Sequence, residues 1–535
     1  MDGRALVPLG DGMAVADADQ GTVAFLDARG QLRPTEVGQE PARLLALGDK
    51  LYVSLRRERA VAELSLADHR LLRKLKVGAE PFGLVALRGR LFVACALEGT
   101  VEELDLDAGR VVQSFAVPDQ PRWITGAGSK LYVVSGMAAT LTEIDVDQGT
   151  VTPRPIPTTQ LQATNTIDVL RFTGDPSLSP DEKNLSIPSL LDVTEVVYYD
   201  NPPQLVPLVV DVPIDAQGAV PELTTMTPLD LTLEQSLSYP TSVAQDPASG
   251  SLIVAFEGTS SFLMMPAQPS LRFEEGRLKA KLLGDSGFSD AITAVPGGIL
   301  ARSRISRTIS RIVEGTVQPV ASLGESGLSR AVEDGRRLFF TQNPQISSCG
   351  ITCSSCHFEG RTDGVTWSRS TGQRQTPSLA EMVAERAPLR WTGDRATIAE
   401  DAMATSKTLG GRGLNEEEAA AVEAFVRTIP GVDLPLKGRE TREMDLGKQA
   451  FSRAGCQGCH GGAVLSDLQL HQLGGPEALK TPSLVGVSAT GPFLHDGSIA
   501  KLSDLVDRAK ELGLGDTTML STEEKAALVT YLESL

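Results

Sequence analysis

The chain has 535 residues and carries 68 Asp and Glu against 50 Lys and Arg, a formal net charge of −18. This length predicts about three or four domains, with ample material for large cores. The acidic excess argues against nucleic acid as a partner, because phosphate backbones are bound by basic surfaces. No run of the sequence approaches the roughly 18 apolar residues of a membrane-spanning helix, so no transmembrane segment is expected.

The first third of the chain repeats with a period of forty residues. "VGQEP" at 37, "VGAEP" at 77 and "VPDQP" at 117 keep this register, as do "LYVS" at 51, "LFVA" at 91 and "LYVV" at 131. Each unit holds four short apolar or alternating runs separated by Gly, Asp and Pro turns, which predicts the four-stranded blade of a β-propeller. The period-two runs and dense turn residues disfavour the alternative, a solenoid of helical repeats.

We expect propeller blades over 1–156 and 237–345, separated by an insertion at 157–236 with one strand in "QLVPLVVDVP". The count is about seven blades, and the last is expected to be short, with two strands or so in "GLSRAVEDGRRLFFTQN". The ring resembles the YVTN-type propeller repeats of exported bacterial proteins. His69 is expected to be a solvated loop residue and Cys95 a packed thiol in a buried strand, so no metal site is expected in the ring.

Two pentapeptides, "CSSCH" at 353–357 and "CQGCH" at 456–460, contain four of the six cysteines and two of the five histidines. C-x-x-C-H is the signature of covalent c-type haem attachment. Two thiols about one turn apart each form a thioether to a haem vinyl group, and the adjacent imidazole becomes the proximal iron ligand. We therefore expect two covalent haems, held by Cys353, Cys356, His357, Cys456, Cys459 and His460.

A zinc site is the alternative for these cysteines. One four-thiolate site assembled from both pentapeptides would leave the two following histidines unexplained. Cys349, four residues before Cys353, fits no haem motif and is interpreted as a spare thiol.

Helical patterns replace the strand-like runs from about residue 380. Asn415 before three glutamates and Ser521 before "TEE" are helix-start signals. The Asn or Ser side chain caps a backbone N–H group, and the helix dipole favours carboxylates in the first turn. A further helix over 441–455 leads directly into Cys456. We therefore predict two small cytochrome c domains, 346–440 and 441–535. The predicted fold class is multidomain: an all-β propeller followed by a mainly α di-haem region.

Residues 335–535 resemble the di-haem cytochrome c peroxidase and MauG superfamily. The matching phrases occur in order: "ITCSSCHFEGRTDGVTW", "RQTPSL", "LRWTGDRATIAEDA", "GCQGCHGG" and "KTPSLVGVSATGPFLHDGSIAKLSDLV". The resemblance implies that Trp391 is an aromatic bridge between the haems and that His495 lies near the pocket of the first haem. It also implies a calcium ion between the haems, held by Gln375, Thr490 and Pro492, although Gln375 stands where relatives have asparagine.

The departures from the family pattern concern the groups opposite each proximal histidine. The stretch "TWSRSTGQRQ" lacks the histidine that caps the first iron in classical members, so the first haem is expected to be open. The family's distal glutamate falls in a shortened segment, where Glu400 and Asp401 are either substitutes or ordinary surface charges. At the second haem, Leu514 and Gly515 replace a Met-Gly pair, which leaves Met519 or His471 as the candidate distal ligand.

The resemblance implies a peroxidase-type oxidoreductase that uses hydrogen peroxide at the His357 haem, with electrons relayed to the His460 haem through Trp391. The electron donor would be a small redox protein, which the acidic surface could steer, or an oxidisable substrate. Two alternatives stay open: a non-catalytic electron-transfer or docking cytochrome, and MauG-like oxidation of a protein or a small organic molecule. "MDGRALVPLG" lacks the features of an export signal. Since c-type haem is attached on the exported side of bacterial membranes, we expect a periplasmic or otherwise exported protein in its mature form, with the signal removed.

Overall fold

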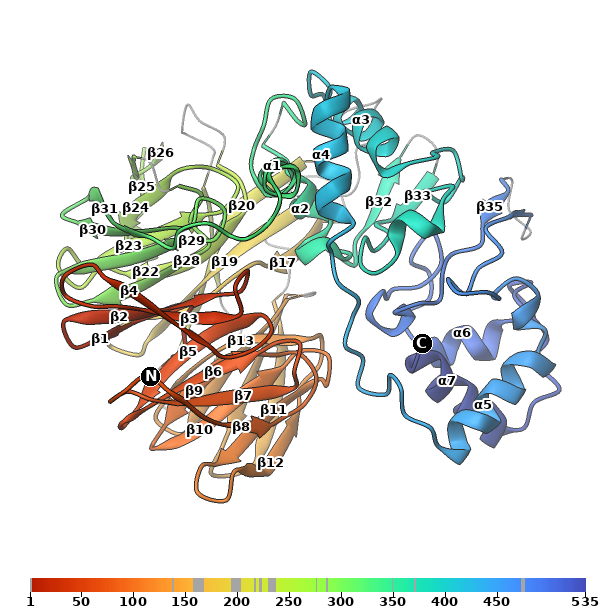
Figure 1. Cartoon of the computed structure of the whole chain (residues 1–535), viewed down its shortest axis with the longest axis horizontal. Helices are drawn as coiled ribbons and strands as arrows, with labels where there is room; N and C mark the ends of the chain where they lie inside the picture. Colours follow the sequence, from red (N-terminus) through yellow and green to blue (C-terminus); the bar gives the residue numbers. More distant parts are fainter. Residues whose placement is uncertain are drawn as a thin grey trace. The chain divides into compact units, whose positions relative to one another are not determined.

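The computed structural model describes residues 2–535 except 137–138, 157–167, 194–203, 216–217, 221–223, 230–236, 276, 285–286, 349, 370–371 and 473–476. The chain forms two compact units, Met1–Val193 with Gln204–Leu328, and Ser329–Leu535. The first unit is built of strands, coloured red to green in Figure 1, and the second is mainly helical, coloured green to blue. The predicted multidomain fold class is confirmed.

The first unit is a seven-bladed β-propeller, with seven sheets of four or five strands in the described part of the chain. The first four blades follow the forty-residue repeat and consist of β1 (Leu6–Leu9), β2 (Gly12–Asp17), β3 (Thr22–Leu26), β4 (Leu32–Glu36), β5 (Pro41–Leu47), β6 (Lys50–Leu55), β7 (Ala60–Ser65), β8 (Leu71–Lys76), β9 (Pro81–Leu87), β10 (Arg90–Cys95), β11 (Thr100–Asp105), β12 (Arg110–Ala116), β13 (Pro121–Ala127), β14 (Lys130–Ser135), β15 (Thr140–Asp145) and β16 (Thr150–Pro155). Their first three strands are mostly buried and their fourth is mostly exposed, as the polar sequence of β8 predicts.

The last three blades depart from the repeat. They consist of β17 (Asp168–Phe172), β18 (Ser177–Leu178), β19 (Asn184–Val193), β20 (Gln204–Pro213), β21 (Thr225–Pro228), β22 (Pro240–Gln245), β23 (Ser251–Phe256), β24 (Phe262–Pro266), β27 (Lys281–Leu283), β28 (Ala291–Val295), β29 (Gly298–Ser303), β30 (Thr308–Val313) and β31 (Thr316–Ser322). A 3₁₀ turn, η2 (Pro269–Leu271), and a hairpin of β25 (Phe273–Glu274) and β26 (Arg277–Leu278) lie between β24 and β27.

The ring closes between the last blade and the first, where β1 packs against β28. The Thr293 hydroxyl donates to the Leu6 carbonyl at 3.0 Å, and Arg302 Nη1 donates to the Ala16 carbonyl at 2.7 Å. The buried Arg307 guanidinium pairs with the Asp17 carboxylate at 2.7 Å. Buried charges persist only where they are paired, so these contacts fix the two ends of the ring together.

Two expectations for the first unit are wrong. The described parts of residues 157–236 hold five strands rather than one, and these strands form a blade. The apolar–polar alternation of these strands is hard to recognise in the sequence because the blade buries charged residues. Arg171 pairs with Asp192, and Arg272 pairs with Asp211. The segment expected to form a short last blade is instead the helix α1 (Arg330–Phe340), capped by the Ser329 hydroxyl, and it belongs to the second unit.

The second unit contains two helical halves. Its elements are α1, α2 (Cys353–Cys356), η3 (Phe358–Gly360), β32 (Thr366–Arg369), β33 (Gly372–Gln375), η4 (Val383–Arg386), α3 (Ile398–Thr408), α4 (Glu416–Val426), α5 (Arg442–Arg453), η5 (Cys456–Gly458), β34 (Leu470–His471), β35 (Leu479–Lys480), η6 (Val487–Ala489), α6 (Leu502–Arg508) and α7 (Thr522–Glu533). The predicted helix starts are confirmed, since Asn415 and Ser521 both form capping boxes. No helix in the described ranges is long and apolar enough to cross a membrane.

Each half is held by one close helix crossing. Helix α1 packs on α4 and α5 packs on α7. Gly335 lies against the Ala421 carbonyl and Gly447 against the Ala527 carbonyl, where a Cβ would come within 1.9 Å and 2.1 Å of the oxygen atoms. A glycine is required at both crossings because no side chain fits between the two backbones.

We predict that Gly447→Ala destabilises the second unit. The added methyl group would force α5 and α7 apart, an overpacking that costs about 1–3 kcal/mol. Gln449→Ala is the matched control, since Gln449 is exposed on the same helix and should change stability little. Urea unfolding followed by circular dichroism at 222 nm would check both variants, and equal midpoints for the two would contradict the close crossing.

Candidate functional site

The first C-x-x-C-H motif forms a single helical turn. Helix α2 places Cys353 and Cys356 at its two ends, and the His357 backbone N–H donates to the Cys353 carbonyl at 2.9 Å. The imidazole Nδ1 of His357 donates to the Arg361 carbonyl at 3.2 Å. This contact fixes the ring and leaves Nε2 available as a ligand, the usual arrangement of a histidine that binds a metal.

The second motif has the same arrangement. The His460 backbone N–H donates to the Cys456 carbonyl at 3.0 Å, and Nδ1 of its ring donates to the Leu465 carbonyl, also at 3.0 Å. In both motifs, therefore, a backbone carbonyl selects the tautomer that presents Nε2.

The protonation of these groups suits haem attachment. Burial raises the pKa of the Cys353 thiol to about 12 and lowers the pKa of both His357 and His460. The four motif cysteines form no disulfide. Neutral thiols remain available for thioether bonds and neutral imidazoles for iron, so the residues present fit two c-type haems.

The zinc alternative does not fit the geometry. Among the described residues, the cluster of three or more possible metal ligands consists of Cys459, Asp467 and His471, and it includes no other motif thiol. A four-thiolate site would need all four thiols around one ion. Cys349, the predicted spare thiol, lies outside the described residues, and Cys95 is fully buried in β10 as expected.

Trp391 lies where the two halves of the second unit meet. Its indole Nε1 donates to the Gln375 carbonyl at 3.0 Å, and the Gln375 backbone N–H donates to the His495 carbonyl at 2.7 Å. The rings of Trp391 and His495 contact each other edge to face, with centroids 6.3 Å apart. The structure therefore brings together three of the predicted site residues from both halves.

The contacts across this junction are reciprocal. The Lys480 backbone N–H donates to the Trp391 carbonyl at 2.8 Å, as that of Gln375 does to His495. Likewise, the Lys480 ammonium donates to the Arg386 carbonyl at 2.8 Å, and the Gln375 amide donates to the Thr490 carbonyl at 2.7 Å. Two equivalent segments, one from each half, thus hold each other.

A weak internal repeat underlies this symmetry. "TPSL" occurs at 376 and 481, and "WTG" at 391 corresponds to "HDG" at 495. Arg390 and Leu494, directly before the two rings, both have left-handed backbones, with φ of 67° and 70°. Such conformations are uncommon outside glycine and persist where surrounding contacts impose them. Aligning the two "TPSL" segments would have identified Lys480 as the counterpart of Gln375, which the motif-by-motif comparison missed.

Gln375, Thr490 and Pro492, the residues expected to hold calcium, do come together. However, the buried Gln375 amide nitrogen donates to the carbonyls of both Thr490 and Pro492. These carbonyl oxygens are the hard ligands that calcium would need. In this arrangement the amide N–H group makes the bonds that an ion would make, and calcium binding by these three residues stays a prediction.

The two candidate acids differ in their surroundings. The exposed Glu400 carboxylate accepts from the Ala396 backbone N–H beside the Thr397 N-cap, so it closes the start of α3. Asp401 pairs with Arg390. After the larger effects of burial and backbone hydrogen bonds, its charge adds to the raised pKa of Cys353 and partly opposes the lowering of the pKa of His357. Of these two acids, Asp401 is therefore the one whose charge reaches the first motif.

The residues considered as distal ligands of the second iron occupy different places. His471 Nε2 lies 2.8 Å from the Asp467 carboxylate, in the cluster beside Cys459. A Cβ at Gly515 would lie 3.5 Å from Cys456 Sγ, so the segment of Leu514 and Gly515 passes the second motif. Met519 follows this segment and is 55% exposed. The choice between His471 and Met519 stays a prediction.

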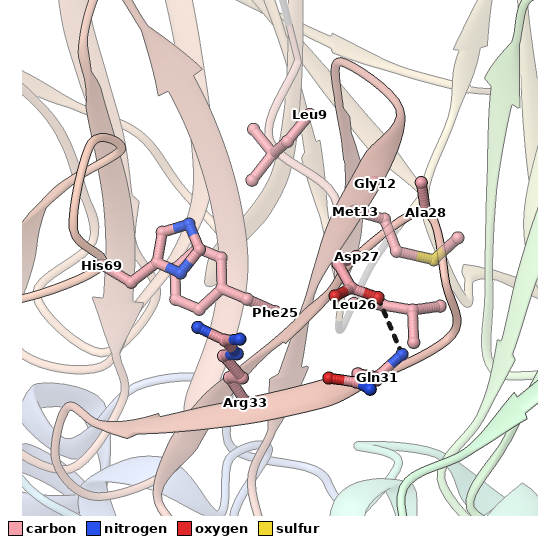
Figure 2. A pocket seen from close by; sticks show the side chains of 10 residues that line it. All are labelled: Leu9, Gly12, Met13, Phe25, Leu26, Asp27, Ala28, Gln31, Arg33 and His69. Atoms are coloured by element: carbon pink, nitrogen blue, oxygen red, sulfur yellow. Dashed lines mark hydrogen bonds between the residues drawn. The ribbon is translucent and has the colours of Figure 1, made fainter.

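The propeller has a pocket of about 340 Å³ lined by residues of its first two blades. His69 stacks face to face on Phe25 in its wall, with ring centroids 3.8 Å apart, and Arg33 lies below them (Figure 2). Asp27 also lines the pocket, but its carboxylate accepts the backbone N–H of Gln31 within a turn. His69 is therefore a half-buried packing residue rather than a solvated one.

Comparison with known proteins agrees with this geometry. The cytochrome c family model matches residues 444–535. The chain is 24% identical over 272 residues to the methylamine utilization protein MauG of Methylophilus methylotrophus, covering 38% of this chain and 81% of the relative. It is also 24% identical over 306 residues to the cytochrome-c peroxidase IdrP2 of Denitromonas iodatirespirans, covering 39% and 83%. The resemblance of the C-terminal part to MauG and cytochrome c peroxidases is confirmed.

Among solved structures, the chain is similar to Kuenenia stuttgartiensis hydrazine synthase, with 18% identity and a TM-score of 0.42 over 59% of this chain and 94% of that one. It is also similar to a MauG-like protein associated with microbial copper homeostasis, with 24% identity and a TM-score of 0.32 over 38% and 88% of the two chains.

We predict that the junction is stable without calcium. Treatment with EDTA should leave the unfolding midpoint of the second unit unchanged, because the Gln375 amide already satisfies the two carbonyls. Gln375→Ala should cost about 1–3 kcal/mol, since it leaves buried carbonyls unpaired. Gln373→Ala, at an exposed position of the same strand, is the control. A lower midpoint of the wild-type protein after chelation would contradict the prediction.

Proposed function

We propose that this chain is a di-haem c-type peroxidase that uses hydrogen peroxide at the haem held by His357, with electrons relayed through the haem held by His460. The similarity to MauG and cytochrome c peroxidases supports a haem peroxidase-like oxidoreductase. The observation that carries the proposal is the placement of Trp391, which is hydrogen-bonded to both halves through Gln375 and Lys480.

The chain's own residues have distinct parts in this proposal. When bound, the haems supply redox-active iron at both motifs. The proximal histidines present Nε2 because carbonyls of Arg361 and Leu465 hold their other nitrogen. The stretch of 366–375 contains no histidine that could cap the first iron, so the open position expected there is where peroxide would bind.

Asp401 is the proposed proton donor and acceptor. Reduction of hydrogen peroxide to two waters consumes two protons as well as two electrons, so a titratable group near the first motif is needed. Arg390 binds the Asp401 carboxylate and also donates to the Thr405 hydroxyl at 3.0 Å, which fixes the acid on the first turn of α3.

Trp391 is the proposed path for electrons. Its indole is the oxidisable ring of the junction, and its hydrogen bonds to Gln375 and from Lys480 restrict its motion. The electron donor is proposed to be a small redox protein or an oxidisable substrate, and the compartment the periplasm. MauG-like oxidation of a protein or an organic molecule is the second candidate, favoured by the similarity to MauG.

We predict that Asp401→Asn slows peroxide reduction by at least about tenfold, the low end for loss of general acid–base catalysis. Glu400→Gln, the neighbouring cap, should stay within about twofold. Both variants should retain two covalent haems in a pyridine haemochrome assay. Stopped-flow absorbance of the holoprotein after peroxide addition would measure the rates. Wild-type protein with two low-spin haems that do not react with peroxide would support an electron-transfer cytochrome instead.

A second prediction concerns Trp391→Phe. Both haems and peroxide binding should be retained, because a phenyl ring fills most of the indole's space. Turnover with an external donor should fall, since phenylalanine is much harder to oxidise than tryptophan. Trp367→Phe is the matched control, because this buried indole bonds to Asp363 and Thr376 within the first half only. If the second haem changes oxidation state after peroxide addition at an undiminished rate in Trp391→Phe, Trp391 is a packing residue.

A further inference from the structure

Two cationic side chains lie together at the junction. Arg386 ends η4 in the first half, Lys480 lies on β35 of the second half, and the Lys480 ammonium donates to the Arg386 carbonyl at 2.8 Å. The Nε and Nη2 atoms of the Arg386 guanidinium are buried and make no hydrogen bond to any described residue. The buried Lys480 ammonium therefore lies beside the Arg386 backbone, and two guanidinium nitrogens of the half-buried Arg386 have no partner among the described residues.

The charges around this pair do not neutralise it. Among the residues that the structure describes, no carboxylate lies within 4 Å of the Arg386 guanidinium or the Lys480 ammonium. Glu381, on the same segment as Arg386, pairs instead with Lys437 at 3.1 Å. Burial lowers the pKa of Arg386, an effect that the charges of Glu381 and Glu385 only partly offset, and burial together with the Arg386 charge lowers the pKa of Lys480 to about 8. Two like charges in this position need an anion to compensate them.

The position of the pair relates it to both haem motifs. Lys480 is followed by Thr481, whose carbonyl accepts from the Ser466 hydroxyl, and Ser466 directly follows Leu465, the partner of His460. In the other half, Pro377 lies two residues after Gln375, and its backbone makes a hydrogen bond that affects the His357 imidazole. The Lys480 strand is thus connected to the loop that holds His460, and the Gln375 strand to the imidazole of His357.

We propose that Arg386 and Lys480 bind a propionate carboxylate of a haem. Each haem carries two propionates, and a carboxylate facing the Nε and Nη2 edge of a guanidinium accepts two parallel hydrogen bonds. The Lys480 ammonium would supply the second positive charge. This inference rests on the proposed function, because it requires haem at one of the two motifs. It assigns a role to two residues that no haem-attachment motif contains.

A positive charge at a propionate has a defined effect on the iron nearby. It disfavours the ferric state, which has one more positive charge than the ferrous state, and so raises the reduction potential. Removing the cation should lower that potential. It should also leave a partly buried propionate without a partner, which raises the pKa of that propionate. The potential should then depend on pH in a range closer to neutrality.

The test is a spectroelectrochemical titration of both haems in the full-length holoprotein. Arg386→Gln should keep two haems by pyridine haemochrome and lower the midpoint potential of one of them. The haem whose potential moves identifies which propionate is bound, and resonance Raman should show its propionate bending mode shifted. Lys525→Gln, which removes an equal charge from a surface ion pair with Asp507, should leave both potentials nearly unchanged. Lys480→Gln gives the same test if Arg386→Gln does not fold.

Three outcomes decide the proposal. A lowered potential with a shifted propionate mode supports it. Potentials and Raman modes equal to those of Lys525→Gln overturn it, as does a wild-type potential that responds to added phosphate, which would indicate a free anion in the site. Fewer than two haems in the wild-type protein would instead refute the proposed function, so the two failures are distinguishable.

Discussion

The second unit depends on a pair of reciprocal backbone hydrogen bonds. The Gln375 N–H donates to the carbonyl of His495, and the Lys480 N–H donates to the carbonyl of Trp391. Each bond ties the strand of one half to the ring-bearing turn of the other. Backbone groups buried in this way need partners, so neither half can move without leaving an N–H and a carbonyl unsatisfied. The contact between the two rings follows from these bonds.

Side chains on the same two strands complete the junction with different chemistry. The Gln375 amide is neutral and satisfies two carbonyls, whereas the Lys480 ammonium satisfies one carbonyl and brings a charge. The first contact occupies the carbonyls that a calcium ion would need. The second, together with Arg386, forms the proposed propionate site. A nearly symmetric backbone therefore carries an asymmetric charge distribution, which is what two haems with different tasks would require.

Local signals predicted much of this fold. The forty-residue repeat located the strands of four blades, because the same pattern of apolar and polar side chains recurs in each of these blades. Capping residues located the starts of α4 and α7, since a cap bonds to backbone only three residues away. The two pentapeptides located the two motifs whose histidines present Nε2, and the resemblance to a known family pointed to Trp391 and His495.

Long-range pairing explains what the sequence did not reveal. Asp192 and Asp211 resemble loop residues until Arg171 and Arg272, distant in sequence, are placed beside them. The helical period of α1 is hard to recognise because its apolar residues are few among charges, and its partner α4 begins 86 residues after α1 begins, at 416 against 330. Arg386 belongs to no recognisable sequence motif. Its role emerges only when β35 of the other half brings Lys480 to its carbonyl.

The most direct measurement of the junction is hydrogen exchange of the native holoprotein, followed by mass spectrometry with residue-level fragmentation. The amides of Gln375 and Lys480 should both be strongly protected and should exchange at similar rates, because opening either bond requires the two halves to separate. The exposed amide of Gln373 provides an internal reference. Rapid exchange at Lys480 with continued protection at Gln375 would show that the bonds are not reciprocal and would contradict the account.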